Sequence, residues 1–202
     1  MKNTKNKKFN SFAKDYLERL NSSFDDQIFL QIEKLANDLK KIWMSKKNLF
    51  ICGNGGSAAN AIHMANDFHY GIGACGPAPL LPGIKVEALS SNSAIITCLG
   101  NDIGFEDIYS HQIEVKANAS DLLIVLSGSG NSANVINALK KAKSIGVKTY
   151  AIVAFSGGKC KKVAHESIHF QINDMQIAED AQLVVGHVCM QWLTINKPNS
   201  IN

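Results

Sequence analysis

The strongest constraint on the fold is a pattern that recurs along the chain: a short apolar run, a loop rich in serine and glycine, and then a helical segment. The pattern occurs three times, over residues 48–70, 84–99 and 122–145. Two further apolar runs, at 147–154 and 167–172, precede a last helical segment at 177–193. Strands that alternate with helices predict a parallel sheet that right-handed crossovers cover on both faces. The expected fold class is therefore α/β, with a five-stranded parallel sheet flanked by helices.

Two helices are expected before the first strand. Apolar residues recur at helical spacing over 9–20, with Asn10 or Ser11 as a start signal, and again from 28 to about 46. Their apolar stripes are larger than covering one sheet edge requires, so we expect these helices to pack between subunits. The alternative is that both helices cap the sheet of their own chain. We divide the chain into a flexible basic tail (1–8), N-terminal helices for oligomerisation (9–46), an α/β domain (47–195) and a C-terminal tail (196–202).

Charge and cysteine content exclude several classes of protein. The net charge is +4, but four lysines lie in the first eight residues, so the remainder of the chain is balanced. A nucleic-acid-binding face is not expected, and Arg19, the single arginine, cannot form a phosphate-clamping cluster. Five cysteines without CxxC spacing favour neither a disulfide framework nor a thiolate zinc site. This cysteine usage best fits a reducing cytoplasm. Because no apolar run follows the basic N-terminus and none reaches membrane-spanning length, we expect a protein that is neither exported nor membrane-embedded.

Two of the loops have the composition of an anion site. At 53–57, three glycines let the backbone approach a ligand, while Ser57 and the first amides of the next helix offer donors. This loop matches neither a Walker loop nor GxGxxG. The loop at 127–132 is also dense in hydroxyls and amides. Each loop alone fits a strand-to-helix turn capped by serine equally well, but two in one parallel sheet favour a bound phosphate, most naturally of a sugar.

Candidate acid, base and metal-binding residues lie on two helical segments. His63 and Asp67 are four residues apart and share a helix face, which suits a divalent metal. Glu179 and His187 are eight residues apart on the last helix, two turns apart on neighbouring faces. Taken alone, this second pair is more typical of a surface glutamate and a core histidine.

Three motifs together resemble the SIS (sugar isomerase) domain family. They are CGNGGSAA at 52–59, LGNDIGFE at 99–106 and LSGSGNS at 126–132, in the order and spacing of that family. Within it, the chain is similar to bacterial phosphoheptose isomerases from about residue 10 to 195. The resemblance implies a flavodoxin-like sheet and a homotetramer formed through the N-terminal helices. It also implies an enzyme that interconverts sedoheptulose 7-phosphate and D-glycero-D-manno-heptose 7-phosphate.

The resemblance further implies the roles of particular residues. Zn²⁺ would be held by His63, Asp67, Glu179 and His187. The same resemblance gives Asp67 and His187 the roles of base and acid. The substrate would contact Asn54, Gly55, Gly56, Ser57, Asn92, Ser127, Gly128, Ser129, Ser132 and Glu179, with the four serines on the phosphate. An aldose and a ketose exchange by moving a proton between C1 and C2, which requires a base at carbon and an acid at oxygen.

The sequence departs from the family at several of these positions. Asp67 replaces Glu and Glu179 replaces Gln, which preserves metal-ligand chemistry but leaves either carboxylate as a candidate base. Asn92 and Gln176 replace acids, and Gly71 occupies a position that the family often gives to Arg. Contacts to the sugar therefore differ more than contacts to the phosphate.

Two other functions fit the same fold. SIS domains also serve as non-catalytic modules, either sugar-phosphate sensors or tetrameric scaffolds that bind replication-initiation proteins, and others act on aminosugar phosphates. A scaffold needs no acid, base and metal set, so the presence of all four residues favours the isomerase. The expected partners are a small sugar phosphate and further copies of the chain, without nucleic acid or membrane.

Overall fold

The computed structural model describes residues 8–77 and 79–199, and at its centre is the parallel sheet expected from the sequence. The strands are β1 (Asn48–Gly53), β2 (Lys85–Ala88), β3 (Leu122–Ser127), β4 (Lys148–Val153) and β5 (Glu166–His169). They lie in the order β2-β1-β3-β4-β5, and every pair of neighbours is parallel. This is the flavodoxin-like order, whose switch point falls between β1 and β3. The expected fold class is confirmed.

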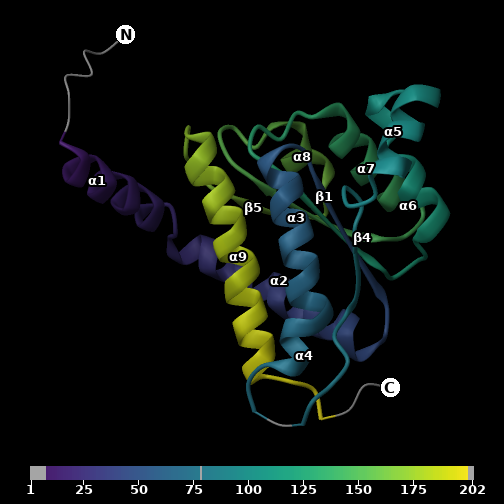
Figure 1. Cartoon of the computed structure of the whole chain (residues 1–202), viewed down its shortest axis with the longest axis horizontal. Helices are drawn as coiled ribbons and strands as arrows, with labels where there is room; N and C mark the ends of the chain where they lie inside the picture. Colours follow the sequence, from purple (N-terminus) through teal and green to yellow (C-terminus); the bar gives the residue numbers. More distant parts are fainter. Residues whose placement is uncertain (1–7, 78, 200–202) are drawn as a thin grey trace.

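Helices cover both faces of the sheet (Figure 1). The longer ones after the first strand are α3 (Gly56–Asn66), α5 (Ser93–Asp102), α7 (Ala133–Ser144) and α9 (Met175–Ile195). Alternate residues of a strand point to opposite faces. Ile124 of β3 therefore packs in one core with α2 (Asp26–Met44), α3 and α9, whereas Val125 packs in the other with α7.

The structure adds three short elements that the sequence pattern does not predict. They are the 3-10 turn η2 (Phe105–Asp107), α6 (Ser110–Lys116) and α8 (Gly158–Val163). With α7, the helices α6 and α8 cover the sheet face opposite to α2, α3 and α9. Each spans two turns or fewer, which is too short for an apolar periodicity to emerge from the sequence.

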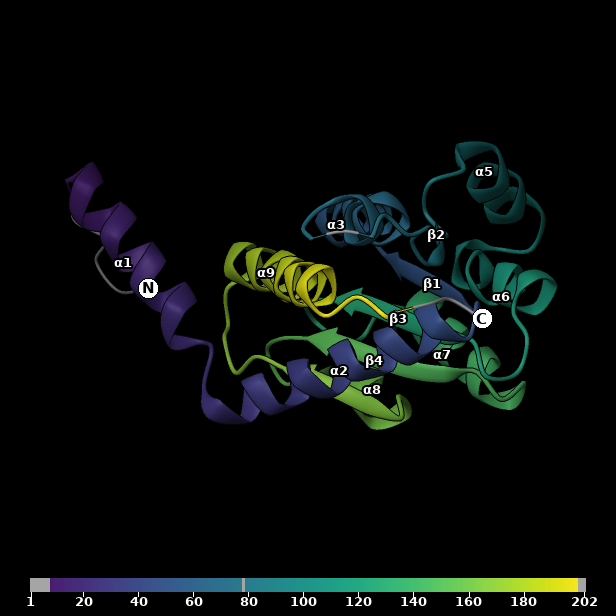
Figure 2. The ribbon, with the colours of Figure 1, turned by 90° about the horizontal axis from the view of Figure 1, so that it is seen from below.

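The two N-terminal helices differ in how they relate to the sheet. α2 buries eight residues, mostly apolar, and so covers its own sheet. α1 (Phe9–Ser22) instead projects from the body (Figures 1 and 2), and none of its residues is buried. Phe9 and Leu17 expose 79% and 63% of their surface. Of the two helices, α2 therefore caps the sheet of its own chain and α1 does not. That α1 packs between subunits stays a prediction.

α1 contacts the body through the first turns of α9. The hydroxyl of Tyr16 donates to Asp180 over 2.5 Å, and Arg19 pairs with Asp174 over 2.7 Å. The hydrogen bond from Arg19 holds the pKa of the Asp174 carboxyl below its usual range. These polar contacts fix the base of α1, so its exposed apolar face has a defined direction relative to α9.

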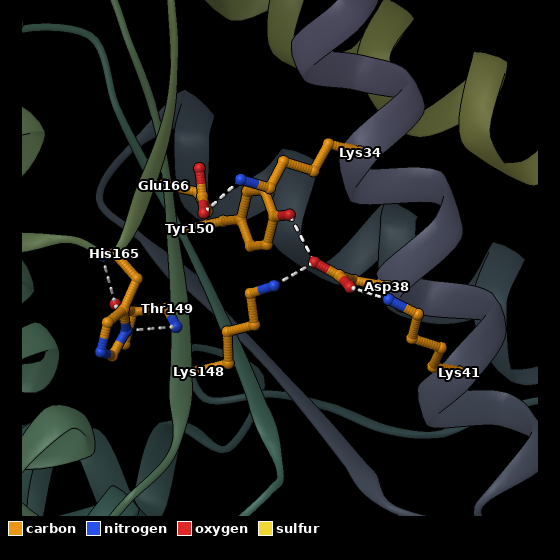
Figure 3. A network of polar contacts seen from close by, with 8 residues as sticks. All are labelled: Lys34, Asp38, Lys41, Lys148, Thr149, Tyr150, His165 and Glu166. Atoms are coloured by element: carbon orange, nitrogen blue, oxygen red, sulfur yellow. Dashed lines mark hydrogen bonds and ion pairs between the residues drawn. The ribbon is translucent and has the colours of Figure 1, made fainter.

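A buried carboxylate joins α2 to the sheet (Figure 3). Asp38, on α2, accepts hydrogen bonds from Lys148 and from the hydroxyl of Tyr150, both on β4, the latter over 2.6 Å. Lys41 adds a contact of 3.1 Å from the solvent side. Burial opposes ionisation of Asp38, but these hydrogen bonds outweigh it, so the pKa of the carboxyl lies below its usual range. The network fixes the rotation of α2 on the sheet.

The chain ends lie partly outside the described residues. Of the basic tail predicted at 1–8, residues 1–7 fall there, as do residues 200–202 of the predicted C-terminal tail. Within 8–77 and 79–199, no helix combines the length and the apolar character needed to cross a membrane.

Candidate active site

The two Ser/Gly loops lie side by side because the strands before them are neighbours. β1 ends at Gly53 and β3 at Ser127, and Gly53 pairs with Leu126. A Cβ on Gly53 would lie 2.8 Å from the carbonyl oxygen of Leu126 and 2.8 Å from Cβ of Ser57. The close approach therefore requires glycine. The carboxyl edge at the switch point of such a sheet is where ligands bind.

The loop after β1 leads into a helix that no side chain caps. Gly55 is the N-cap of α3 at φ 56°, a conformation that favours glycine. None of the first amides of α3 is capped by a side chain. Ser57, the second residue of α3, is buried. The helix start therefore combines unused amide donors with the positive end of the dipole, which suits an anion.

The loop after β3 likewise leads into a helix whose N-cap side chain makes no cap hydrogen bond. Ser132 is the N-cap of α7, but its hydroxyl makes no cap hydrogen bond. Ser127 and Ser129 instead accept hydrogen bonds from amides within the loop, at 3.2 and 3.3 Å. Side chains cap α2, α5 and α9, whereas α1, α6 and α8 also begin without a side-chain cap. Because Ser132 makes no cap hydrogen bond, this loop is not a plain serine-capped turn, and its hydroxyls and amides suit an anion.

Two glycines of this second loop are backed by neighbouring segments. A Cβ on Gly128 would lie 2.4 Å from Sδ of Met175, and one on Gly130 would lie 2.1 Å from the carbonyl oxygen of Gly157. The carbonyl of Gly130 also accepts a hydrogen bond from the amide of Cys160, over 2.9 Å. The starts of α8 and α9 therefore pack against this loop.

Two asparagines expected to contact the substrate make hydrogen bonds within the chain. Asn92 caps α5 through a 3.1 Å hydrogen bond from the amide of Ile95. Asn54 exchanges two hydrogen bonds of 2.9 Å with Asn134, at the start of α7. Sequence reasoning missed Asn134, because nothing in the local pattern ties it to a residue 80 positions away.

Three of the four proposed metal ligands meet between α3 and α9. Nε2 of His63 lies 2.9 Å from Nε2 of His187. The carboxylate of Asp67 lies 3.4 Å from the first nitrogen and 3.6 Å from the second. All three ligand atoms lie within 4.8 Å of one another. The side chains of His63 and His187 are 49% and 45% exposed, so in a single chain the cluster lies at the surface.

A π-helical turn begins at Asp67. α3 passes into η1 (Asp67–Gly71) and then α4 (Ile72–Ala74) without interruption, and the amide of Ile72 donates to the carbonyl of Asp67 five residues before it. Such turns are rare and occur frequently at functional sites. Here the turn starts at the residue that faces both histidines.

Glu179, the fourth proposed ligand, lies outside this three-residue cluster. Its carboxylate packs on Gly56, where an added Cβ would be 2.3 Å from Oε2. Eight residues separate it from His187, which places the two about 12 Å apart along the helix axis. α9 therefore presents a histidine to the cluster and a carboxylate to the start of α3, beside the first Ser/Gly loop.

Comparisons with known proteins agree with this architecture. The family model described as the SIS domain matches residues 10–154. A probable phosphoheptose isomerase of Thermoplasma volcanium is 33% identical over 176 residues, covering 86% of each chain. A phosphoheptose isomerase of Aliarcobacter butzleri is 35% identical over 162 residues, covering 79% of this chain and 82% of the relative. A solved phosphoheptose isomerase from Francisella tularensis superposes with a TM-score of 0.83 at 21% identity, covering 93% of this chain and 96% of its own.

A parallel sheet with uncapped Ser/Gly loops at its carboxyl edge defines an α/β protein whose loop edge suits an anionic ligand. The family match covers most of this chain, and the curated relatives align over most of their own length. The chain belongs to the SIS domain family.

Proposed function

We propose that the chain is an aldose–ketose isomerase that interconverts sedoheptulose 7-phosphate and D-glycero-D-manno-heptose 7-phosphate. One observation carries the proposal: His63, Asp67 and His187 meet between α3 and α9, in a chain whose curated relatives are phosphoheptose isomerases. The two uncapped Ser/Gly loops supply the phosphate site that this substrate requires. A sensor or scaffold would need the loops but not the cluster.

The reaction needs two proton transfers and no oxidant. A base removes the proton from one of C1 and C2 and returns it to the other through an enediol, while an acid moves a proton between the two oxygens. We propose either Asp67, which lies in the cluster, or Glu179, which packs on Gly56, for the transfer at carbon. His187 would serve the oxygens through Nε2.

The cluster suits a divalent metal. Two imidazole nitrogens 2.9 Å apart, with a carboxylate oxygen within 3.6 Å of both, form a set of donors that a cation between them would satisfy. Two nitrogens and one carboxylate also match the three protein ligands of a catalytic zinc site with an open position. We therefore propose that His63, Asp67 and His187 hold Zn²⁺. When bound, it would polarise the sugar carbonyl and stabilise the enediolate.

Glu179 would join the ligand set only if its carboxylate left Gly56. In its present place it lies beside the loop at 53–57. We therefore propose that Glu179 faces the sugar and that either Glu179 or Asp67 is the base. The four serines at 57, 127, 129 and 132 would bind the phosphate together with the amides at the starts of α3 and α7.

Association would complete the site. The two histidines are about half exposed in one chain, and α1 leaves its apolar face uncovered. Water exclusion strengthens electrostatic interactions in an active site. We therefore propose a homotetramer whose N-terminal helices pack between subunits, as the family resemblance implies.

The test is turnover of sedoheptulose 7-phosphate by the purified chain and by His187→Gln. Loss of one essential proton-transfer group typically costs about 100-fold to 10,000-fold in rate. His111→Gln is the matched control, since His111 is exposed on α6 and outside the cluster. Zinc measured in the same samples should fall in His187→Gln and not in His111→Gln. Near-normal turnover by His187→Gln would refute the catalytic assignment.

The two carboxylates are separated by a second pair of variants. Asp67→Asn and Glu179→Gln remove the charge with little change of shape. Because only one group takes the proton from carbon, the two should differ in kcat by tenfold or more when kcat is measured in saturating zinc and expressed per zinc-loaded protein. Asp67→Asn should also lower the zinc content, whereas Glu179→Gln should leave it unchanged. Equal activity in both variants would place the base elsewhere.

A further inference from the structure

The two Ser/Gly loops are joined by a reciprocal pair of amides. Nδ2 of Asn54 donates to Oδ1 of Asn134, and Nδ2 of Asn134 donates to Oδ1 of Asn54, each over 2.9 Å. Asn54 is the first residue after β1, immediately before the N-cap of α3. Asn134 is the second residue of α7, two positions after the last serine of the second loop. The pair therefore connects the starts of both helices.

The surroundings fix the orientation of this pair. The amide of Val135 donates to Oδ1 of Asn134 over 2.9 Å, which identifies the oxygen end of that side chain. The hydroxyl of Tyr109, which is buried, donates to the carbonyl of Gly53 over 2.5 Å and holds the end of β1. Burial raises the pKa of Tyr109, so it remains a donor at neutral pH. Asn134 is only 2% exposed and cannot reach solvent as an alternative partner.

We propose that Asn134 is a positioning residue, which through Asn54 fixes the spacing between the two helix starts that bind the phosphate. A phosphate bound by both loops needs amides and hydroxyls from α3 and α7 at one separation. The sheet sets the distance between β1 and β3, but each loop leaves its strand before its helix begins. The amide pair crosses this gap beyond the carboxyl ends of the strands. The inference rests on the proposed function, because it assumes that both loops share one phosphate.

A solely structural role makes a different prediction. Asn134 would then stabilise the fold, and its loss would lower the melting temperature without a selective effect on phosphate. α7 is also held elsewhere, because Asn137, one turn later, donates to the carbonyl of Glu106 over 3.1 Å and to Asp107 over 3.2 Å. Asn137 thus provides a matched control: the same residue type on the same helix, bonded to η2 rather than to Asn54.

The experiment measures three quantities for Asn134→Ala, Asn134→Leu and Asn137→Ala: the Kd for inorganic phosphate, the KM and kcat for sedoheptulose 7-phosphate, and the melting temperature. We expect both Asn134 variants to raise the Kd and the KM about tenfold with kcat within about threefold of the unaltered protein. Asn137→Ala should change the Kd and the KM less than twofold. Leucine fills the volume that alanine would leave empty, so Asn134→Leu still tests the proposal if Asn134→Ala folds poorly.

A double-mutant cycle tests whether the effect passes through Asn54. If the two asparagines act as a pair, Asn54→Ala combined with Asn134→Ala should weaken phosphate binding no more than the stronger single change. Additive effects would overturn the proposal, as would an unchanged Kd in both Asn134 variants. The proposed function can fail separately. If the unaltered protein binds phosphate but does not turn over the sugar, the isomerase assignment is wrong, while the role of Asn134 in phosphate binding can still be tested. No phosphate binding by the unaltered protein would overturn both.

Discussion

Replacing Asp38 should show how much the polar network between α2 and β4 contributes to stability (Figure 3). Asp38→Ala leaves the hydroxyl of Tyr150 without its acceptor inside the core, where Tyr150 is 1% exposed. A hydrogen bond to a charged group contributes about 1.5–3 kcal/mol. The two lysines add little, because the side chains of Lys148 and Lys41 are 40% and 77% exposed and such ion pairs contribute about 0–1 kcal/mol.

The expected loss in the free energy of unfolding is therefore about 3 kcal/mol. At roughly 2–4 °C per kcal/mol for a chain of this length, the melting temperature should fall by about 6–12 °C. Tyr150→Phe, which keeps both lysines on Asp38, should lose about half as much free energy. Urea denaturation at one fixed protein concentration measures all variants, because association would make the midpoint depend on concentration. A loss below 1 kcal/mol in Asp38→Ala would refute the reasoning.

The pH dependence of the same network has a defined sign. The pKa of Asp38 is lowered in the folded state, so its charge stabilises the protein above the unfolded pKa of about 3.9. That stabilisation is lost as the pH falls through the lower, folded pKa. The difference in stability between the unaltered protein and Asp38→Asn should therefore be constant near neutral pH and shrink below about pH 4. A difference that grew as the pH fell would contradict the assignment.

Three further outcomes are expected. Ser127→Ala should weaken sugar-phosphate binding by about 1–3 kcal/mol in calorimetry while the far-UV circular dichroism stays the same; an unchanged KM would exclude this loop as the phosphate site. Gly56→Ala should displace the carboxylate of Glu179, which would lie 2.3 Å from the new Cβ, and should therefore change kcat by about as much as Glu179→Gln does, with little change in melting temperature. Light scattering at micromolar concentration should give a tetramer, and Phe12→Asp on the exposed face of α1 should shift it to smaller species; a monomeric unaltered protein would contradict the role of α1.

The sheet and its loops could be predicted from the sequence because their signals are local. The three central strands, β1, β3 and β4, are apolar runs buried on both faces, and each run ends in residues that favour turns. The edge strands β2 and β5 are shorter and more polar, so their signal lies mainly in the neighbouring turns. The short helices α6 and α8 escaped prediction, since they span too few residues to show a period. The observed ends of the helices differ from the predicted ends by only a few residues. The last helix, for example, begins at Met175 rather than at 177.

The candidate site was predictable only in part. His63 and Asp67 are related by helical spacing. Their contact with His187 depends on how α9 packs against α3, and residue spacing along one helix does not predict that packing. The place of Glu179 on Gly56 likewise follows from that packing. The Asn54–Asn134 pair joins residues far apart in the sequence, and asparagine beside a glycine loop is first interpreted as a turn residue.

The π-helical turn at Asp67–Gly71 affects how this chain is aligned with its relatives. Such a turn contains one residue more than an α-helical turn, so every later side chain is rotated by about 100° relative to an uninterrupted helix. A family residue four positions after the carboxylate therefore corresponds to Gly71 in one register and to Ile72 in the other. Both are buried and uncharged. Neither residue carries a positive charge, so under the proposed function this turn supplies no cation to the phosphate in either alignment.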